Sequence, residues 1–160
     1  MLTNQKNATL QLFRGLRGIW KLKRHLGTQG YMQGRASFQP WGKEVLYYQE
    51  QGWATFSNSK ARYAHRAYAY VYDQGTLAVY FWDQKYKQPA ELLHTLQFHS
   101  PQPDRQTIMA TGTHGCAEDI YRACYLFINP QQFQLTYQVQ GPHKDYTIAS
   151  HFSKVRDKEQ

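Results

Sequence analysis

The segment 113–121 (THGCAEDIY) holds residue types that could carry out acid–base chemistry. His114 or Tyr121 could act as a general acid or base, and Asp119 could orient the histidine. Such a set would suit an isomerase, cyclase or lyase that acts on a small molecule. His114 and Cys116 could also form a nucleophile pair, although residues two apart on a strand share a face without necessarily touching. The alternative is a structural histidine bonded to a backbone carbonyl.

Two arginines lie in strand patterns whose other members are mostly apolar or aromatic. Arg24 shares a face with Trp20, and Arg66 shares one with Tyr68. A guanidinium in a dry core cannot lose its charge, so it needs a carboxylate or an anionic ligand. Alternatively, each arginine could reach water where its strand ends, with its stem along apolar surface. The candidate internal partners are Glu50 and Asp119.

A cation and a phenol follow the Gly-Pro turn at 141–142. Lys144 and Tyr146 share a face at the start of a predicted strand. They would line the mouth of a barrel, beside the strand that carries Tyr137. The alternative is a surface pair between Lys144 and Asp145, worth under about 1 kcal/mol.

The histidines and cysteines do not form a recognisable metal site. His114 and Cys116 have neither the number nor the spacing of structural zinc ligands, so we predict no metal site. A haem would need His94 or His114 as its axial ligand, and no c-type attachment motif accompanies either residue. The cofactor therefore stays unspecified, with haem as a minor alternative.

These residues are carried by segments in which apolar residues recur with a period of two, as in β-strands. Residues 132–140 show this best, with four apolar side chains on one face and glutamines and a threonine on the other. A helix of one or two turns is predicted over 9–15, with Thr9 as its N-cap. The predicted strands are 19–26, 32–39, 45–50, 61–72, 76–82, 92–98, 106–111, 119–128, 132–140 and 144–152, with a short extended piece at 53–56.

Short strands joined by hairpin-sized turns predict an all-β fold. Closure of an antiparallel up-and-down sheet of about eight to ten strands would remove its exposed edges. We therefore predict a β-barrel with a short N-terminal helix. Small residues such as Gly34, Ala36 and Ala64 alternate with aromatic residues on the predicted inner faces. They would either help side chains to fill a tapered core or leave a cavity lined by rings.

A chain of 160 residues is most simply one domain, 1–160, with a core over about 13–153. Aromatic residues make up 16% of it, which excludes a disordered chain because such rings must be buried or stacked. We expect no membrane span, because every apolar run is short, and no secretory signal at the start. Two cysteines make no disulfide framework, so a cytoplasmic location is expected.

The sequence is strongly basic, with a net charge of +8 and an isoelectric point of about 9.5. Residues 1–42 contain no Asp or Glu. A basic surface can serve solubility or attract an anionic partner. No arginine-rich run, zinc-finger spacing, RNA-recognition octapeptide or helix-turn-helix pattern accompanies the charge. A small anionic ligand is therefore favoured over nucleic acid.

Several motifs taken together resemble the DUF6314 family over residues 13–152. The first part of the resemblance consists of Gly18-x-Trp20 with Arg24, Gly34-x-Ala36-x-Phe38, residues 47–52 and Ala61-Arg62-Tyr63. The second part consists of Leu93-His94-Thr95-Leu96, His114-x-Cys116-x-x-Asp119-x-Tyr121 and Gly141-Pro142-x-Lys144-Asp145-Tyr146. The resemblance implies a lipocalin-type or calycin-type barrel, because a Gly-x-Trp near the first strand is typical of that superfamily. It implies no particular activity.

We therefore hypothesise that the chain binds a small amphipathic or anionic ligand inside a barrel, between aromatic walls and a few polar groups. The alternative is an enzyme that uses His114, Tyr121 and Asp119 in the same cavity. Calycin-like barrels include both binders and enzymes, so the fold does not choose between them. The predicted ligand contacts are Trp20, Arg24, Arg66, Tyr68, His94, His114, Asp119, Tyr121, Tyr137, Lys144 and Tyr146.

Overall fold

The computed structural model describes residues 2–99 and 106–156, which form one helix and ten strands. Helix α1 (Leu2–Gly15) precedes all the strands, and no helix within these ranges is long and apolar enough to cross a membrane. The strands are β1 (Gly18–Leu26), β2 (Gly30–Pro40), β3 (Val45–Phe56), β4 (Arg62–Asp73), β5 (Thr76–Asp83), β6 (Gln88–Phe98), β7 (Ile108–Cys116), β8 (Asp119–Asn129), β9 (Gln132–Gly141) and β10 (Lys144–Lys154).

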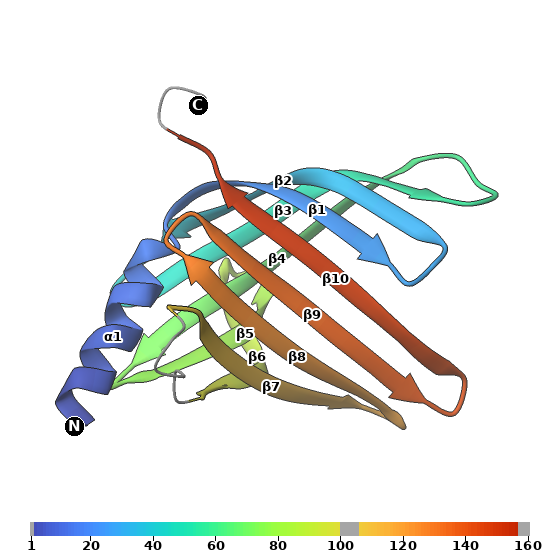
Figure 1. Cartoon of the computed structure of the whole chain (residues 1–160). Helices are drawn as coiled ribbons and strands as arrows, with labels where there is room; N and C mark the ends of the chain where they lie inside the picture. The colour runs from blue at the N-terminus through green and yellow to red at the C-terminus, as the bar shows by residue number, and fades with distance from the viewer. Residues whose placement is uncertain (1, 100–105, 157–160) are drawn as a thin grey trace.

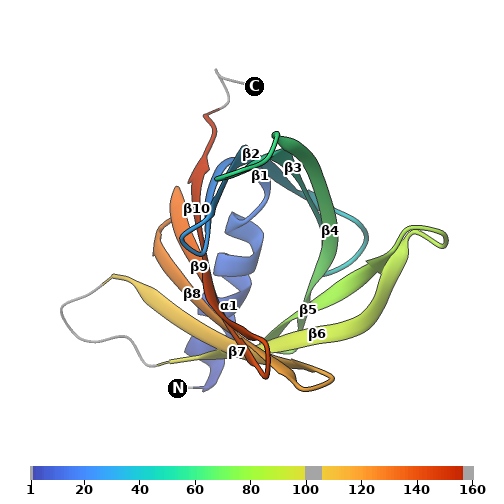
Figure 2. The ribbon, with the colours of Figure 1, turned by 90° about the vertical axis from the view of Figure 1, so that its right-hand side faces the viewer.

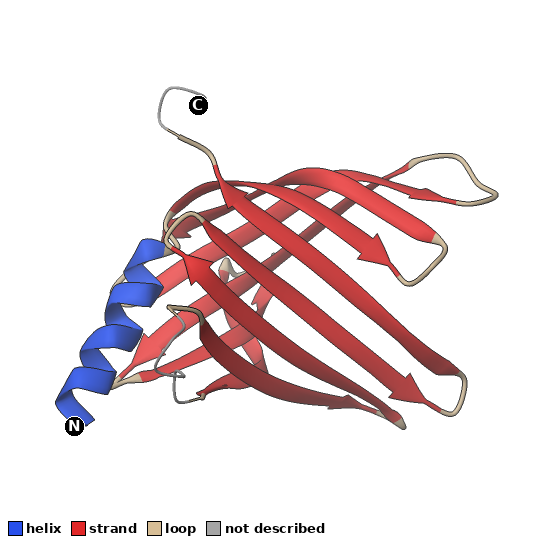
Figure 3. Ribbon diagram, viewed as in Figure 1, coloured by secondary structure: helices blue, strands red, loops and turns tan. Residues whose placement is uncertain are grey.

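The strands follow one another around a closed barrel, drawn in Figure 1 and, with the helix in blue and the strands in red, in Figure 3. Each strand is antiparallel to its neighbours, and β10 closes the barrel by pairing with β1 from Trp20 opposite Lys154 to Leu26 opposite Ile148. The shortest ladder joins β6 to β7, which pair only at Gln97 opposite Thr111 and at Phe98 opposite Ala110. The predicted antiparallel up-and-down barrel with an N-terminal helix is confirmed, and it has ten strands.

The helix is longer than predicted. It covers Leu2–Gly15, so Thr9 lies in its interior, and the prediction of a cap there is wrong. The Thr9 hydroxyl donates to the Gln5 carbonyl one turn earlier, at 3.0 Å. This bond satisfies a hydroxyl on the buried side of the helix, because Thr9 is only 5% exposed.

Two glycines let β2 and β3 approach each other closely. Gly34 and Gly52 are cross-strand partners, and a Cβ built on Gly34 would lie 2.7 Å from the Gly52 Cα. Gly52 is therefore a strand residue, and the prediction that residues 51–52 end a strand is wrong. β3 runs unbroken to Phe56 because a missing side chain, rather than a turn, is what this position requires.

Gly34→Ala is expected to lower the free energy of unfolding by about 1–3 kcal/mol, because the extra carbon would be forced against backbone atoms. Denaturant unfolding measures this loss. Gly115→Ala is the matched control, since no atom lies within 4 Å of a Cβ built there, and it should leave stability unchanged or slightly raised. Equal unfolding midpoints for the two variants would contradict the close approach of β2 and β3.

The hydrophobic core fills the end of the barrel that α1 covers, which we call the closed end. Figure 2 looks into the barrel from the other end, with α1 lying behind the strands. Phe13 of the helix and Leu16, the residue just after it, are 1% and 3% exposed. In the same part of the core, Trp20 packs edge-on against Phe38 and Phe133, at ring-centroid distances of 6.4 and 5.0 Å. We call the opposite end, where β1, β3 and β9 finish, the far end.

Candidate functional site

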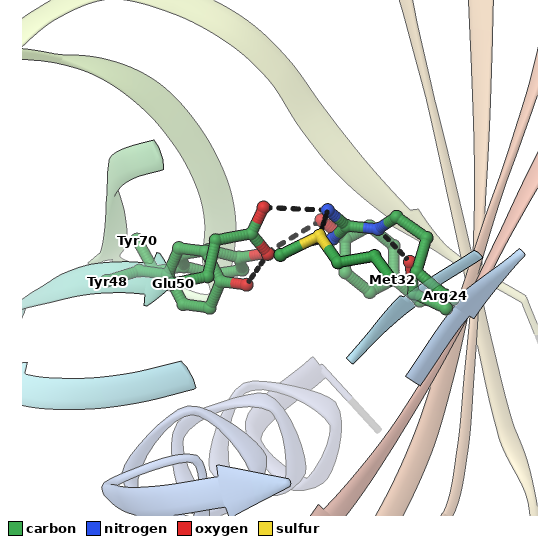
Figure 4. A network of polar contacts seen from close by, with 7 residues as sticks. Arg24, Met32, Tyr48, Glu50 and Tyr70 are labelled. Atoms are coloured by element: carbon green, nitrogen blue, oxygen red, sulfur yellow. Dashed lines mark hydrogen bonds and ion pairs between the residues drawn. The ribbon is translucent and has the colours of Figure 1, made fainter. Parts of the chain in front are cut away.

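A buried ion pair joins β1 and β3 inside the barrel (Figure 4). The Arg24 guanidinium donates to both carboxylate oxygens of Glu50 at 2.8 Å, and its Nε donates to the Ser150 hydroxyl at 2.7 Å. The Tyr48 hydroxyl donates to Glu50 Oε2 at 2.6 Å, and the Met32 sulfur lies 3.6 Å from Arg24 Nη1. The Arg24 and Glu50 side chains are only 12% and 3% exposed. The carboxylate that a buried guanidinium requires is thus supplied by the chain itself.

The ionisation of this pair is fixed by its partners. Burial opposes the charge of Glu50, but the hydrogen bond and Coulomb attraction to Arg24 outweigh burial and hold the pKa of this carboxyl below its ordinary 4.5. Burial also opposes the charge of Arg24, but the hydrogen bond and the Coulomb attraction to Glu50 together outweigh burial, so the pKa of the guanidinium is raised. Burial, and then the charge of Glu50, raises the pKa of Tyr48. At neutral pH the pair is therefore charged, with a protonated phenol beside it.

Aromatic side chains line the inside of the barrel at the far end. The register and the alternation of faces place Tyr68, Phe81, His114 and Tyr121 on the inner face. Their successive ring centroids are 6.1, 5.7 and 6.3 Å apart. None of these four residues, which we call the aromatic arc, is fully buried, and Phe81 is 36% exposed. Inner-facing rings that water can reach show that the barrel is open at this end.

Arg66 lies beside the aromatic arc, two residues before Tyr68 on β4. It is the cross-strand partner of Glu50, so both residues belong to the inner face. Arg66 is exposed to solvent, and it makes no hydrogen bond or ion pair with any residue that the structure describes. Its charge helps to lower the pKa of Glu50, but that carboxylate is already bonded by Arg24 and Tyr48. Arg66 therefore presents a solvent-exposed cation without a hydrogen-bonded counter-charge on the inner face of the barrel.

His94 is enclosed deeper in the barrel. It is 2% exposed, its Nε2 lies 3.1 Å from the Tyr137 hydroxyl, and its ring packs edge-on against Tyr125. A Cβ at Gly112 would lie 2.9 Å from the His94 Cγ, so the imidazole occupies the space that this glycine leaves. Burial lowers the pKa of His94, which keeps the imidazole neutral at pH 7. An enclosed ring is poorly placed to ligate a haem iron, and His114 is the accessible imidazole of the two.

Asp119 and Lys144 form an ion pair at the rim of the far end. The Lys144 Nζ lies 2.8 Å from Asp119 Oδ2 and donates to the Tyr121 hydroxyl at 3.3 Å. The hydrogen bond to Asp119, and then the bond to Tyr121, raises the pKa of Lys144. His114 has ring contacts but no hydrogen-bond partner within the described ranges, where no group of three metal-ligating side chains is found either. The structure thus pairs Asp119 with a lysine and leaves His114 without a carboxylate to orient it.

The predicted ligand contacts fall into three sets. The far end holds Arg66, Tyr68, His114, Asp119, Tyr121, Lys144 and Tyr146, the last of which is 39% exposed. Arg24, His94 and Tyr137 lie deeper and bond to protein partners. Trp20 lies apart from both sets at the closed end, where it is 2% exposed and its Nε1 donates to the Leu16 carbonyl at 2.9 Å.

Two inner-facing residues of this region, Phe81 and Tyr48, were not among the ligand contacts predicted from the sequence. Phe81 lies in Thr76–Asp83, a strand in which apolar residues at successive positions conceal the inner face. Tyr48 follows another tyrosine, Tyr47, and the sequence does not show which of the two points inward. The strand register shows that both residues face inward, because each is a cross-strand partner of the inner-facing Tyr68.

A hollow of about 300 Å³ lies at the closed end between α1 and the turn from β8 to β9. Its wall includes Leu12, Leu16, Trp20 and Phe133, and it contains no charged side chain. Of the predicted ligand contacts, only Trp20 borders it. Without a charged group it offers nothing to hold an anion, so the far end is the stronger candidate site.

Several solved structures are similar to this chain. The chain is similar to the S-type phycobiliprotein lyase CPES from Guillardia theta, with 12% identity and a TM-score of 0.58 over 95% of this chain and 94% of that one. It also matches mFAP1, a redesigned β-barrel bound to DFHBI, with 14% identity and a TM-score of 0.41 over 89% and 98% of the two chains. A fluorescence-activating β-barrel designed de novo matches with 8% identity and a TM-score of 0.46 over 89% and 95%. At 12% identity, the likeness to CPES describes the fold alone.

Sequence comparison identifies the family. No curated protein matches this sequence. The model of DUF6314, a family of unknown function, matches residues 16–154, which include all ten strands of the barrel. This chain therefore belongs to the DUF6314 family.

Proposed function

We propose that this protein binds a small, amphipathic and anionic molecule inside the far end of the barrel. The observation that carries the proposal is Arg66, an inner-facing and exposed cation without an ionic partner among the described residues. A guanidinium can donate two parallel hydrogen bonds, which suits a carboxylate, a sulfonate or a phosphate. An anionic group on the ligand would supply the partner that Arg66 lacks.

The aromatic arc would hold the apolar part of the same ligand. Tyr68 and Phe81 offer ring surface next to Arg66, and flat ligands pack favourably on such rings in offset or edge-on geometry. The other ion pairs near the site are balanced, since Arg24 is bonded to Glu50 and Lys144 to Asp119. Arg66 would therefore give the site its preference for anions.

Fluorescence titration with anilinonaphthalene sulfonate, a planar aromatic sulfonate, tests this proposal. Arg66→Gln is expected to weaken binding about tenfold or more, because a hydrogen bond to a charged group contributes about 1.5–3 kcal/mol. Arg122→Gln is the matched control: Arg122 is on β8, where its inner-facing neighbour is Tyr121, and its outer side chain bonds to Gln140. The control should keep the affinity of the parent within about twofold.

Phe81→Ala adds a second readout, because it removes ring surface without changing charge. Phe81→Ala should weaken binding of the sulfonate and of an uncharged analogue alike. Arg66→Gln should weaken binding of the sulfonate and also abolish the preference for the sulfonate over the uncharged analogue. The proposal fails if Arg66→Gln and Arg122→Gln bind the probe equally well. Native mass spectrometry of the freshly purified protein would then identify any natural ligand through its non-covalent mass increment.

A further inference from the structure

We propose that the outer face of β1–β4 is a second binding site, and that its ligand is single-stranded nucleic acid. The charge of the chain is divided unevenly along its length. Residues 1–72 contain eleven lysines and arginines and two carboxylates, whereas residues 73–160 contain eight and nine. The positive excess therefore belongs to the segment that builds α1 and nearly all of β1–β4.

The two carboxylates in this segment do not offset the charge of the outer face. Glu50 lies inside the barrel and pairs with Arg24. Glu44 lies in the turn before β3, 3.9 Å from Arg14. The outward positions of β1, β2 and β3 contain no Asp or Glu, so this part of the wall is cationic.

The register gathers cations, amides and aromatic rings on this face. One row runs across four strands, through the successive cross-strand partners Lys23, Gln33, Trp53 and Tyr63. In the next row Arg35 lies opposite Gln51. These six residues are all exposed, and we call them the basic wall. Their strands are adjacent in the barrel (Figure 1). Neighbouring strands of a sheet lie about 5 Å apart.

The two rings of the basic wall are unusually exposed for large aromatic side chains. Trp53 and Tyr63 are 59% and 56% exposed, with ring centroids 5.7 Å apart and planes inclined at 70°. The Tyr63 hydroxyl donates to Gln51 Oε1 at 2.9 Å, so the phenol is held in place while the amide nitrogen of Gln51 remains a donor. An edge-to-face pair of this kind leaves ring surface open for stacking.

Single-stranded nucleic acid matches each of these groups. Lys23 and Arg35 would contact phosphates, Trp53 and Tyr63 would stack with bases, and Gln33 and Gln51 would reach base edges. A duplex keeps its base faces stacked inside, so exposed rings favour a single strand. An anionic membrane surface would use the cations and the rings, but it would give the amides of Gln33 and Gln51 no role. The residues of the basic wall come from four strands, which explains why no linear nucleic-acid motif is present in the sequence.

Fluorescence anisotropy with labelled oligo-dT and oligo-U of about 12 nucleotides tests the proposal on the full chain. We expect binding at about 50 mM salt that weakens steeply as salt rises. Lys23→Gln/Arg35→Gln should reduce the slope of log affinity against log salt by about 1.4, because two phosphate contacts are lost. Trp53→Ala should weaken binding about fivefold or more at constant salt. The matched control is Lys85→Gln/Lys87→Gln, which removes the same charge from the turn between β5 and β6.

Several results would overturn the proposal. One is the absence of oligonucleotide binding at low salt, and another is an equal loss of affinity in the control variant. Binding to phosphatidylserine vesicles but not to oligonucleotides would assign the basic wall to a membrane surface instead. Thermal unfolding shows that each variant is folded, and the Lys23/Arg35 pair tests the site even if Trp53→Ala proves unstable. Binding of the sulfonate probe inside the barrel is a separate readout, so either proposal can fail without the other.

Discussion

Glu50→Ala is expected to lower the free energy of unfolding by about 3–5 kcal/mol, because it leaves the Arg24 guanidinium buried without its counter-charge. Arg24 is only 12% exposed, and a guanidinium does not lose its proton to escape the cost. The Tyr48 hydroxyl would lose its acceptor at the same time. Denaturant unfolding followed by far-UV circular dichroism measures the change.

The triple variant Arg24→Met/Tyr48→Phe/Glu50→Leu is the control for this prediction. It replaces all three polar groups with apolar ones of similar size, so nothing charged is left buried and alone. Such replacements are often neutral or stabilising, and we expect stability equal to or above that of the parent. A triple variant as unstable as Glu50→Ala would contradict this explanation. It would show that the protein loses stability whenever the ion pair is absent, even when no unpaired charge is left buried.

The pH dependence of stability provides an independent check on the same pair. The pKa of Glu50 in the folded protein lies below its ordinary 4.5, so folding favours the ionised form. This contribution is present in full above about pH 4.5 and is lost as the pH falls through the folded-state pKa. The parent should therefore lose more stability in acid than the triple variant, which has no carboxyl at this position.

The barrel could be predicted from the sequence because its signals are local. Alternating residues mark each strand, and Gly, Pro, Asn and Asp mark the turns between them. A glycine inside a strand is harder to interpret from the sequence, because glycine is also common in turns. At Gly52 it resembles a turn, although here it permits the close approach of β2 and β3, a fact that depends on the partner strand.

The candidate site was harder to predict because its contacts depend on the register of distant strands. Arg24 is 26 residues from Glu50 and 126 residues from Ser150 along the chain, and a shift of one residue in any strand would separate them. Arg24 and Arg66 looked alike in the sequence, as lone cations on aromatic faces. The structure distinguishes them, because only Arg24 receives a carboxylate at bonding distance.

Trp20→Ala is the second exchange with a large expected effect, a loss of about 3–5 kcal/mol in the free energy of unfolding. The Trp20 ring is 2% exposed and packs edge-on against Phe38 and Phe133. Its removal would enlarge the hollow of about 300 Å³ that it already borders at the closed end. The surrounding backbone belongs to a closed ladder of strands, which limits how far it can collapse into the space.

The indole nitrogen makes Trp20 the link between the barrel and α1, since it donates to the carbonyl of Leu16 just after the helix. Trp20→Phe keeps much of the ring but loses this donor, so it should cost about 1–3 kcal/mol, less than Trp20→Ala. Trp41→Ala is the matched control, because Trp41 is 45% exposed and should cost under about 1 kcal/mol. Limited trypsin digestion at Arg14 and Arg17 reports separately on the helix. If Trp20 anchors α1, cleavage there should accelerate in both Trp20 variants before the barrel unfolds, and unchanged cleavage would contradict that role.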